Sequence, residues 1–161
     1  MKARGGEKEK RYYRIQIGDV LFWNFLKSIG LSPAKSKTIG KVAIPSKYFS
    51  DFLRGSHDGD GHFYSYWDPR WKSSFMYYVC FSSASLAHIE WLRDELRKRM
   101  SVRGHITKAS KKVCYQLKYA KKEGLKVIKV MYKSKGVFLP RKKLKIAKVL
   151  GIMGLKLGDS H

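Results

Sequence analysis

The sequence predicts an α+β fold, in which helices alternate with β-hairpins and an antiparallel sheet packs against the helices as a second layer. Two observations lead to this prediction. Across residues 46–150, helical and alternating hydrophobic patterns follow each other in the order helix, hairpin, helix, hairpin, helix. The chain of 161 residues is 43% hydrophobic and 14% aromatic, which is enough for one core of ordinary size.

Two elements are predicted ahead of this unit. RYYRIQIG (11–18) alternates between an apolar and a polar face, which predicts a half-buried strand. DVLFWNFLKSIG (19–30) has helical spacing, with Asp19 as a start signal and Gly30 as a C-terminal cap. Residues 31–44 then form loop and short extended structure.

The core unit begins at Pro45 and Ser46, which start a helix that runs into FLRGSHDGDG, residues 52–61. A hairpin follows, with strands 62–67 and 73–81 and a turn at Asp68–Arg70. Next come an amphipathic helix over 86–100 that Ser85 caps, and a second hairpin from 101–110 and 111–121. A helix over 122–133 and a basic helix from Pro140 complete the unit. Four segments are therefore expected: a flexible basic N-terminus (1–10), a partial repeat of strand, helix and linker (11–45), a core domain (46–150) and a C-terminal tail (151–161).

The charge of the chain favours a polyanionic partner. Lysine and arginine number 35 against 12 acids, which leaves a net charge of +23 and a pI near 10.1. Nineteen basic residues lie between Arg97 and Lys148, where Glu123 is the single acid. Such a field attracts phosphate backbones through neutralisation and counterion release. A ribosomal or membrane-surface protein would also be basic, but the hydrophobic content excludes a solvated tail. We therefore expect nucleic acid as the partner.

Features that the sequence lacks argue against a zinc-binding, a secreted or a membrane-spanning protein. Cys80 and Cys114 lie in predicted strands without Cys or His neighbours at zinc-ligand spacing, so they are interpreted as small buried hydrophobes of a reducing compartment. The N-terminus MKARGGEKEKR has no apolar run behind it, and no stretch reaches transmembrane length. The expected location is the cytoplasm of a prokaryote or an organelle, and secretion is not expected.

Part of the chain repeats itself. YYRIQIGDVLFWNFLKSIGL resembles CYQLKYAKKEGLKVIKVMYK, with Tyr13 over Tyr115 and Ile15 over Leu117. Both segments are followed by Lys-Ser-Lys and then by a proline. One structural unit used about one and a half times explains this order, although any strand followed by a helix shares part of the similarity.

The stretch FLRGSHDGDGHF, residues 52–63, places two acids among three glycines at a helix end. A calcium loop starting at Asp58 is excluded, because its sixth position would be Phe63 instead of glycine and its twelfth Pro69. A helix end with solvated acids, in which Gly61 supplies a positive φ, is one interpretation.

A different interpretation uses the whole stretch. One helix face carries Phe52, Gly55, Ser56 and Gly59. A glycine inside a helix costs about 1 kcal/mol relative to alanine, so two on one face indicate the close approach of a second helix. Asp60 would then lie at the foot of a helix pair under a basic sheet, where a divalent cation beside phosphates explains the acid.

FLRGSHDGDG, the element order behind it and the approach IGLSPAKSKTIGKVAIPSKYF resemble the LAGLIDADG family of homing endonucleases, over most of residues 11–150. The resemblance implies the αββαββα fold of that family with an antiparallel DNA-binding sheet. It implies a site-specific endonuclease that hydrolyses phosphodiester bonds of double-stranded DNA with Mg²⁺, for which Mn²⁺ substitutes, and a role in intron or intein mobility. The implied catalytic residue and metal ligand is Asp60, with the Gly59 carbonyl as a further ligand and Asp58 as a less frequent one. A homodimer through the motif helix is also implied.

The sequence departs from the family pattern at three places. Ser56 and His57 replace apolar residues, and His57 is interpreted as a core or surface histidine instead of a ligand. The lysine that family members often carry at the end of the second strand is missing from FSSAS (81–85). Only one full motif is present, since residues 11–30 match the back half of a repeat. A non-cleaving relative that binds DNA or intron RNA, a maturase or a regulator, is therefore the main alternative, and a basic structural RNA-binding protein is the third.

Strand alternation and loop position assign the candidate DNA contacts. Side chains expected to face away from the helices, or to lie in the adjoining loops, are Tyr64, Tyr66, Arg70, Lys72, Arg103, His105, Thr107, Gln116 and Lys118. Arg and Lys suit guanine edges, Gln suits adenine, and Tyr and Thr suit phosphates or thymine methyl groups. Val113, Tyr115 and Leu117 are expected to point inward. Phosphate contacts are expected from Lys111, Lys112, Lys121, Lys122, Arg141, Lys142 and Lys143.

Overall fold

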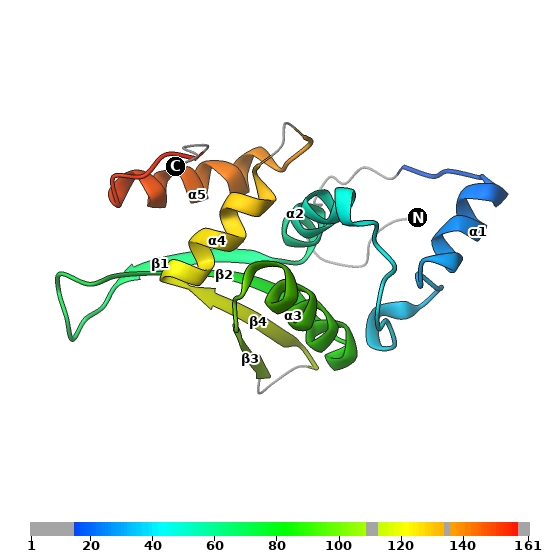
Figure 1. Cartoon of the computed structure of the whole chain (residues 1–161), viewed down its shortest axis with the longest axis horizontal. Helices are drawn as coiled ribbons and strands as arrows, with labels where there is room; N and C mark the ends of the chain where they lie inside the picture. The colour runs from blue at the N-terminus through cyan, green and yellow to red at the C-terminus, as the bar shows by residue number, and fades with distance from the viewer. Residues whose placement is uncertain (1–14, 109–112, 134–135, 158–161) are drawn as a thin grey trace, which may run out of the picture.

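The computed structural model describes residues 15–108, 113–133 and 136–157 (Figure 1). Its elements, with η for 3₁₀ helices, are α1 (Val20–Ser28), η1 (Lys35–Lys37), η2 (Ser46–Tyr48), α2 (Phe49–Gly59), β1 (His62–Trp67), β2 (Phe75–Ser83), α3 (Leu86–Met100), β3 (His105–Lys108), β4 (Tyr115–Ala120), α4 (Lys121–Met131) and α5 (Pro140–Ile152). From α2 to α4 the order is helix, hairpin, helix, hairpin, helix. The predicted α+β class and αββαββα order are therefore confirmed.

The four strands form one antiparallel sheet with the order β1-β2-β4-β3. The two hairpins meet at β2 and β4, which are the central strands. Helices α3 and α4 pack on these central strands, α2 reaches β2, and α5 packs beside β1. The sheet thus supports the C-terminal end of α2, which leads directly into β1.

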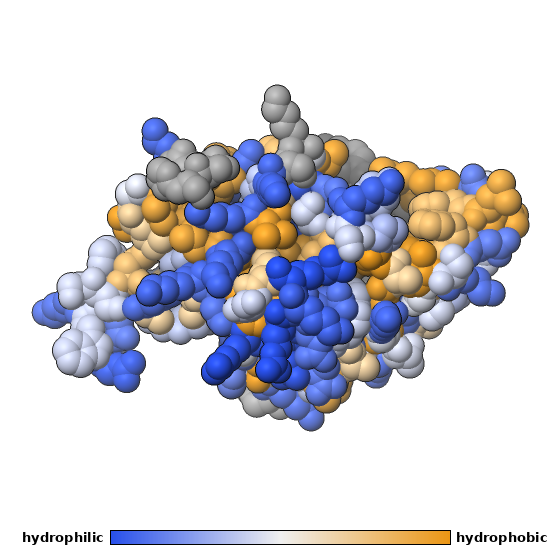
Figure 2. All heavy atoms as spheres, in the orientation of Figure 1, coloured by the Kyte–Doolittle hydropathy of each residue, from blue (hydrophilic) through white to orange (hydrophobic). Residues whose placement is uncertain are grey.

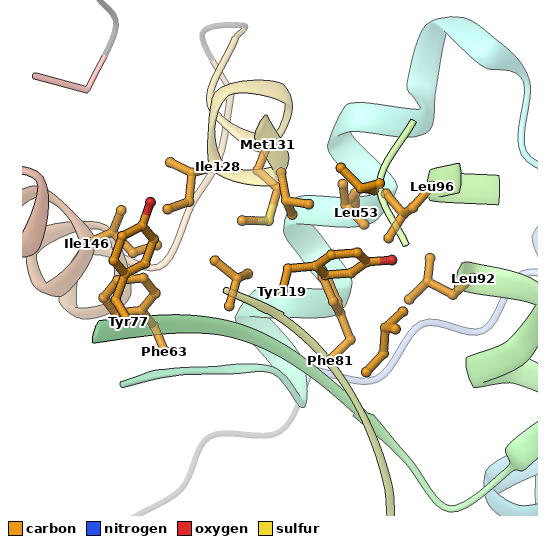
Figure 3. Packing of buried hydrophobic residues seen from close by; sticks show 14 of the residues in the cluster. Leu53, Phe63, Tyr77, Phe81, Leu92, Leu96, Tyr119, Ile128, Met131 and Ile146 are labelled. Carbon is orange, nitrogen blue, oxygen red and sulfur yellow. The ribbon is translucent and has the colours of Figure 1, made fainter. Parts of the chain in front are cut away.

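The core fills the space between the helices and one face of the sheet (Figure 3). The strands contribute alternate residues that are at most 4% exposed, namely Phe63, Tyr77, Val79, Phe81, Leu117 and Tyr119. The helices contribute side chains that are at most 1% exposed, namely Leu53, Leu92, Leu96, Ile128, Met131 and Ile146. Burying one such side chain stabilises the fold by about 1.5–3 kcal/mol, so the alternation decides which face of each strand points inward.

Local signals set the ends of several helices as predicted. The Asp19 carboxylate accepts a hydrogen bond from the backbone N–H of Phe22 at 2.8 Å and begins α1. The Ser85 hydroxyl oxygen accepts from the backbone N–H of His88 at 3.4 Å and begins α3. Gly30 follows α1 with a φ of 97°, a left-handed conformation that suits glycine and ends the helix.

Helix α1 buries none of its residues. Leu21 is 82% exposed and Phe25 is 55% exposed, and Figure 2 shows the resulting hydrophobic surface at the right of the molecule. The strand predicted for residues 11–18 is not formed over 15–18, the part that the structure describes, where Ile15 is 88% exposed. A strand needs a neighbouring strand for its backbone hydrogen bonds, and within the described ranges the sheet contains only β1 to β4. None of the helices in these ranges is long and apolar enough to cross a membrane.

The repeat in the sequence relates α1 to α4. It places Phe25 of α1 over Val127 of α4, and Leu26 over Ile128. The two α4 residues are fully buried against the sheet, at 0% and 1% exposure. Helix α1 therefore has the residue pattern of a helix that packs on a sheet, but the described part of the chain has no second sheet for it to cover.

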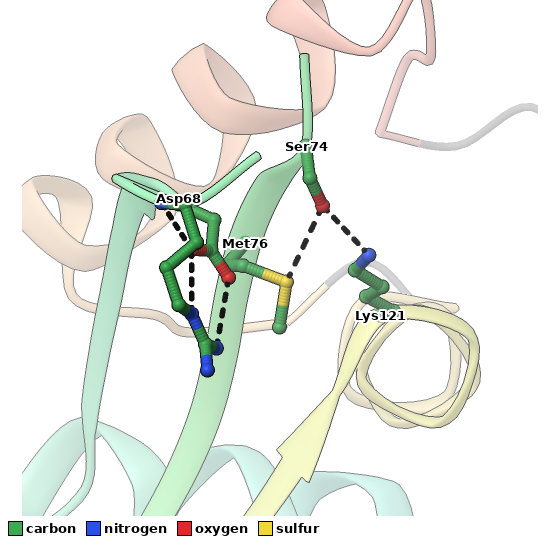
Figure 4. A network of polar contacts seen from close by, with 5 residues as sticks. Asp68, Ser74, Met76 and Lys121 are labelled. Atoms are coloured by element: carbon green, nitrogen blue, oxygen red, sulfur yellow. Dashed lines mark hydrogen bonds and ion pairs between the residues drawn. The ribbon is translucent and has the colours of Figure 1, made fainter. Parts of the chain in front are cut away.

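The connection between β1 and β2 is longer than the predicted turn and spans residues 68–74. Asp68 does not continue the outward-facing row of β1, because its carboxylate accepts hydrogen bonds from the backbone N–H of Arg70 at 2.9 Å and from its Nε at 3.3 Å (Figure 4). These bonds with Arg70 lower the pKa of Asp68 below its usual value. On the other side of the loop, Nζ of Lys121 donates to Oγ of Ser74 at 3.2 Å, which ties the loop to the start of α4.

Candidate nucleic-acid interface

The second face of the sheet is formed by the residues that alternate with the core. We call it the open face; in register across the strands it carries His62, Tyr64 and Tyr66 of β1, Met76, Tyr78, Cys80 and Ser82 of β2, Gln116, Lys118 and Ala120 of β4, and His105 and Thr107 of β3. Six of these residues are among the DNA contacts that the sequence predicts, namely Tyr64, Tyr66, His105, Thr107, Gln116 and Lys118. The face carries five hydroxyl groups, the amide of Gln116 and the ammonium of Lys118, and such groups recognise phosphates and base edges.

An aromatic row crosses the open face. The rings of Tyr64 and Tyr78 lie 4.9 Å apart with an interplanar angle of 14°, and Tyr66 and His62 stack on Tyr64 at 6.4 Å and 5.9 Å. Ring centroids 4.9 Å apart cannot lie side by side in one plane, so the rings stand against one another and turn their edges outward. Burial raises the pKa of Tyr64 and of Tyr78, so both hydroxyl groups stay protonated at neutral pH. Tyr78 was missed in the sequence, although the alternation of its strand contained the signal.

Positive charge concentrates where the open face approaches α2. Lys118 pairs in register with Cys80, which in turn pairs with His62. Burial, and then the charges of Lys118, Lys142 and Lys145, lower the pKa of His62 below its usual value. His62 is therefore neutral at physiological pH. Cys80 is 0% exposed, as predicted for a small buried hydrophobe, and burial raises the pKa of its thiol to about 11.

The other predicted contacts lie outside the open face. Arg70 and Lys72 are exposed in the β1–β2 loop. Arg103 precedes β3, and its backbone N–H donates to the Glu123 carboxylate at 2.7 Å, so only its side chain is free to reach a ligand. Val113 was expected to point inward, but it lies outside β4 and is 55% exposed. The predicted contacts at residues 111 and 112 lie outside the described residues.

Asp60 ends α2 as an exposed side chain immediately before the sheet. The next residue, Gly61, passes so close to α2 that an added Cβ atom would lie 2.7 Å from the His57 carbonyl oxygen and 2.8 Å from that of Cys80. Gly61 is not among the described glycines with positive φ, so the prediction that it supplies such a φ is wrong. Glycine is required here for close approach, which fixes Asp60 against the edge of the sheet.

Lys142 holds this junction together from α5. Its Nζ donates to the carbonyl oxygens of His57 and Gly61, both at 2.6 Å. The carbonyl of His57 belongs to the last turn of α2, where carbonyls lack partners within the helix. Burial and the neighbouring charge of Arg141 lower the pKa of Lys142. Lys142 was predicted to contact phosphate, but its ammonium group is used inside the protein.

The acids of the motif have different surroundings. Asp58 accepts a hydrogen bond from the backbone N–H of Leu139 at 2.8 Å and thereby anchors the segment before α5. Within the described residues, no three His, Cys, Asp or Glu side chains gather into a metal site. Gly59 ends α2 and Asp60 caps it, and both residues are exposed, so the Gly59 carbonyl and the Asp60 carboxylate can supply two oxygens. Because Mg²⁺ takes six oxygens and often keeps waters and substrate phosphates, these two oxygens fit a site that the substrate completes.

The glycine face of α2 is partly free. Gly55 and Gly59 are exposed, and a Cβ atom added to either would meet no heavy atom within 4 Å. Phe52, predicted on the same face, is half-buried and packs edge-on against Trp91 at 5.7 Å. The glycines therefore serve no contact in the described part of this chain.

A cleft of about 480 Å³ lies beside Asp60. Its walls come from α2, the end of β2, the start of α3 and the linker turn η1, and its polar lining residues are Lys35, Ser36, Ser56, Asp60, Ser82, Ser83 and His88. The place of the linker in this cleft could not be predicted from the sequence, because no local pattern indicates where a loop folds back.

His57 is 0% exposed and lies in the core, which agrees with the first of its two interpretations, a core or a surface histidine. Its ring packs edge-on against Phe81 at 5.8 Å, and neither ring nitrogen has a hydrogen-bond partner among the described residues. Burial, and then the charge of Lys142, lower the pKa of His57 to about 4. A histidine in this state is neutral and unpaired, which makes it a source of instability.

The similarity of this chain to known proteins lies in its structure. No family model and no curated protein sequence matches this chain. The chain is similar to a solved structure of the homing endonuclease I-TnaI, with a TM-score of 0.46 and 17% sequence identity over 65% of this chain and 74% of that one.

Replacing His57 by leucine is expected to stabilise the protein, most strongly in acid. Between pH 6.5 and about 4, His57 is protonated in the unfolded chain but neutral in the folded chain. The free energy of unfolding therefore decreases as the pH falls through this window, by up to about 3 kcal/mol. His57→Leu removes this decrease. Urea unfolding at several pH values measures the free energy of unfolding of the wild type and the variant, and His105→Leu on the exposed edge strand serves as control. An unchanged pH dependence in His57→Leu would contradict the assignment.

Two glycine substitutions in the same motif are expected to have opposite effects. Gly55→Ala should raise the free energy of unfolding by about 1 kcal/mol, because the added methyl group meets no atom and alanine favours helix. Gly61→Ala should lower it by about 1–3 kcal/mol, because its Cβ would overlap two carbonyl oxygens. Thermal or urea unfolding of the two variants and the wild type measures both changes in the free energy of unfolding. The close approach at Gly61 is refuted if Gly61→Ala is as stable as the wild type.

Proposed function

We propose that this protein is a site-specific double-strand DNA endonuclease of the homing type and of the LAGLIDADG kind, which hydrolyses phosphodiester bonds with Mg²⁺. The observation that carries the proposal is the position of Asp60. Its exposed carboxylate is held at the end of α2, beside a cleft and at the edge of a hydroxyl-rich sheet face near which Lys118, Lys142 and Lys145 gather. An acid is favourable in such a positive field when it binds a cation together with phosphate.

Double-stranded DNA is the partner that best suits the open face. The net charge of +23 supports binding to a phosphate backbone. The tyrosine rings of the aromatic row stack on one another and turn edges and hydroxyl groups outward. Upright rings contact groove edges and phosphates, whereas single-stranded RNA needs free ring faces on which bases stack. Gln116, Lys118 and Thr107 add groups that discriminate base pairs.

Asp60 and the Gly59 carbonyl would hold the metal ion. When bound, Mg²⁺ activates a water molecule and stabilises charge on the leaving oxygen. The chain's own residues give this site its rigidity. Lys142 fixes the last turn of α2 from one side, and Gly61 brings the acid to the sheet from the other. A preorganised carboxylate of this kind avoids rearrangement during the reaction.

A homodimer would bring two such sites together. Gly55 and Gly59 leave one face of α2 open to a second helix at close distance. Two copies paired through this face would present two open faces and two Asp60 carboxylates to one long, partly palindromic site. A protein that stays monomeric both free and on DNA would contradict this arrangement.

A non-cleaving DNA- or intron-RNA-binding relative is the alternative. The observation that favours it is that, among the described residues, no three His, Cys, Asp or Glu side chains gather into a metal site around Asp60. Such a protein would retain the charged open face and would use Asp60 only to balance nearby lysines.

Asp60→Asn is expected to abolish cleavage and to preserve binding. Removing the carboxylate charge from the metal site should slow strand cleavage at least about a thousandfold, while metal-free DNA affinity stays equal or rises because the phosphate contacts lie elsewhere. Single-turnover cleavage and binding assays on the best-bound site measure both. Asp94→Asn, which removes one exposed acid from α3, serves as the matched control.

Two outcomes would count against the proposal. If the wild type cuts no DNA in Mg²⁺ or Mn²⁺, the non-cleaving alternative replaces it. If Asp60→Asn cuts as fast as the wild type, the catalytic assignment is wrong even though the reaction stands.

A further inference from the structure

The linker between α1 and α2 is fixed against the start of α3. The Ser85 hydroxyl donates to the carbonyl oxygen of Ile39 at 2.5 Å, and Nδ1 of His88 lies 2.9 Å from that of Gly40. Because a carbonyl only accepts, the proton of His88 must be on Nδ1. Val42 is 2% exposed and anchors the next part of the linker. The linker is therefore held in a fixed position, where it forms one wall of the cleft beside Asp60.

The turn η1 fixes the backbone of Lys35 in this wall. The carbonyl oxygen of Lys35 accepts hydrogen bonds from the N–H groups of Thr38 at 3.0 Å and Ile39 at 2.8 Å. The residue before it, Ala34, has a φ of 51°, a left-handed conformation that is unusual for a residue other than glycine. Such strain persists when the surrounding structure requires one position of the chain, and it is common at functional sites.

The cations near Asp60 differ in what they are free to bind. Lys142 donates to two backbone carbonyls and is used structurally. Lys118 stands on the open face in register with Cys80. Lys35 has an exposed side chain and lines the cleft together with Asp60. Of these three lysines, Lys35 is the one that lines the cleft.

We propose that the cleft binds a phosphodiester group of the substrate and that Lys35 supplies the positive charge beside Asp60. The proposal rests on the proposed endonuclease function. In the hydrolysis, a bond forms between phosphorus and the oxygen of water while the bond from phosphorus to the leaving sugar oxygen breaks. The proton released by the water is balanced by the proton that the leaving oxygen takes up. The Lys35 ammonium keeps its own proton and stabilises the charge on the non-bridging oxygens. The linker thus provides the lysine that is missing from residues 81–85.

Lys37 offers a matched control, because it belongs to the same turn and is exposed but does not line the cleft. Lys35→Ala, Lys35→Arg and Lys37→Ala are compared on the DNA site that the wild type cuts. We expect Lys35→Ala to slow single-turnover cleavage at least about a hundredfold, with partial rescue in Lys35→Arg. Lys37→Ala should cut nearly as fast as the wild type. Both alanine variants should lower the salt dependence of binding by at most about one charge.

A binding measurement separates this proposal from the proposed function. Inorganic phosphate is titrated into the wild type and Lys35→Ala, and amide NMR shifts are followed at Ser36, Ser83 and His88. The shifts should saturate in the wild type and weaken at least about tenfold in Lys35→Ala. Shifts that are absent from the wild type or equal in both proteins would overturn the anion site, as would equal cleavage rates in Lys35→Ala and Lys37→Ala. A wild type that binds phosphate through Lys35 but cuts no DNA would overturn the endonuclease function and the catalytic role of Lys35, and leave the anion site standing.

Discussion

At Gly61 the chain leaves α2 and enters β1 so closely that a side chain would lie 2.7 Å from one carbonyl oxygen and 2.8 Å from another. This contact joins the helix to β2, because the second oxygen belongs to Cys80. Lys142 then binds the carbonyls on both sides of Asp60 from a helix that lies about eighty residues further along the chain. The direction of Asp60, the start of the open face and one wall of the cleft all depend on this junction.

The same region contains several features that lower stability. His57 buries two unpaired ring nitrogens, Gly55 and Gly59 weaken a helix without making a contact, and Ala34 adopts a left-handed conformation. Lys142 is held in a partly buried position that lowers its pKa. These features surround one exposed carboxylate, whereas the core behind the sheet follows ordinary alternation. Violations of local rules that cluster around one polar site are characteristic of functional sites.

Much of the fold could be predicted, because it is encoded locally. The capping residues Asp19 and Ser85 mark helix starts, and alternation in residues 62–67 assigns both faces of β1. The strand expected at 11–18 is not formed over residues 15–18, the part that the structure describes, because alternation shows which face of a strand would be buried but not whether a neighbouring strand exists. The positions of Lys142 at the end of α2 and of Lys35 in the lining of the cleft could not be predicted either. Both depend on segments distant in sequence that fold back onto α2, and a lysine in a basic run resembles any phosphate contact.

The most direct measurement of the central claim is the digestion of a random-site double-stranded DNA library by the wild-type protein in Mg²⁺, followed by sequencing of the ends. If Asp60 and the open face form a site-specific nuclease, the ends will converge on one long, partly palindromic sequence, and chelation of the metal will abolish them. Ends without a common sequence, or no cleavage above the chelated control while the protein still binds the library, would contradict the claim.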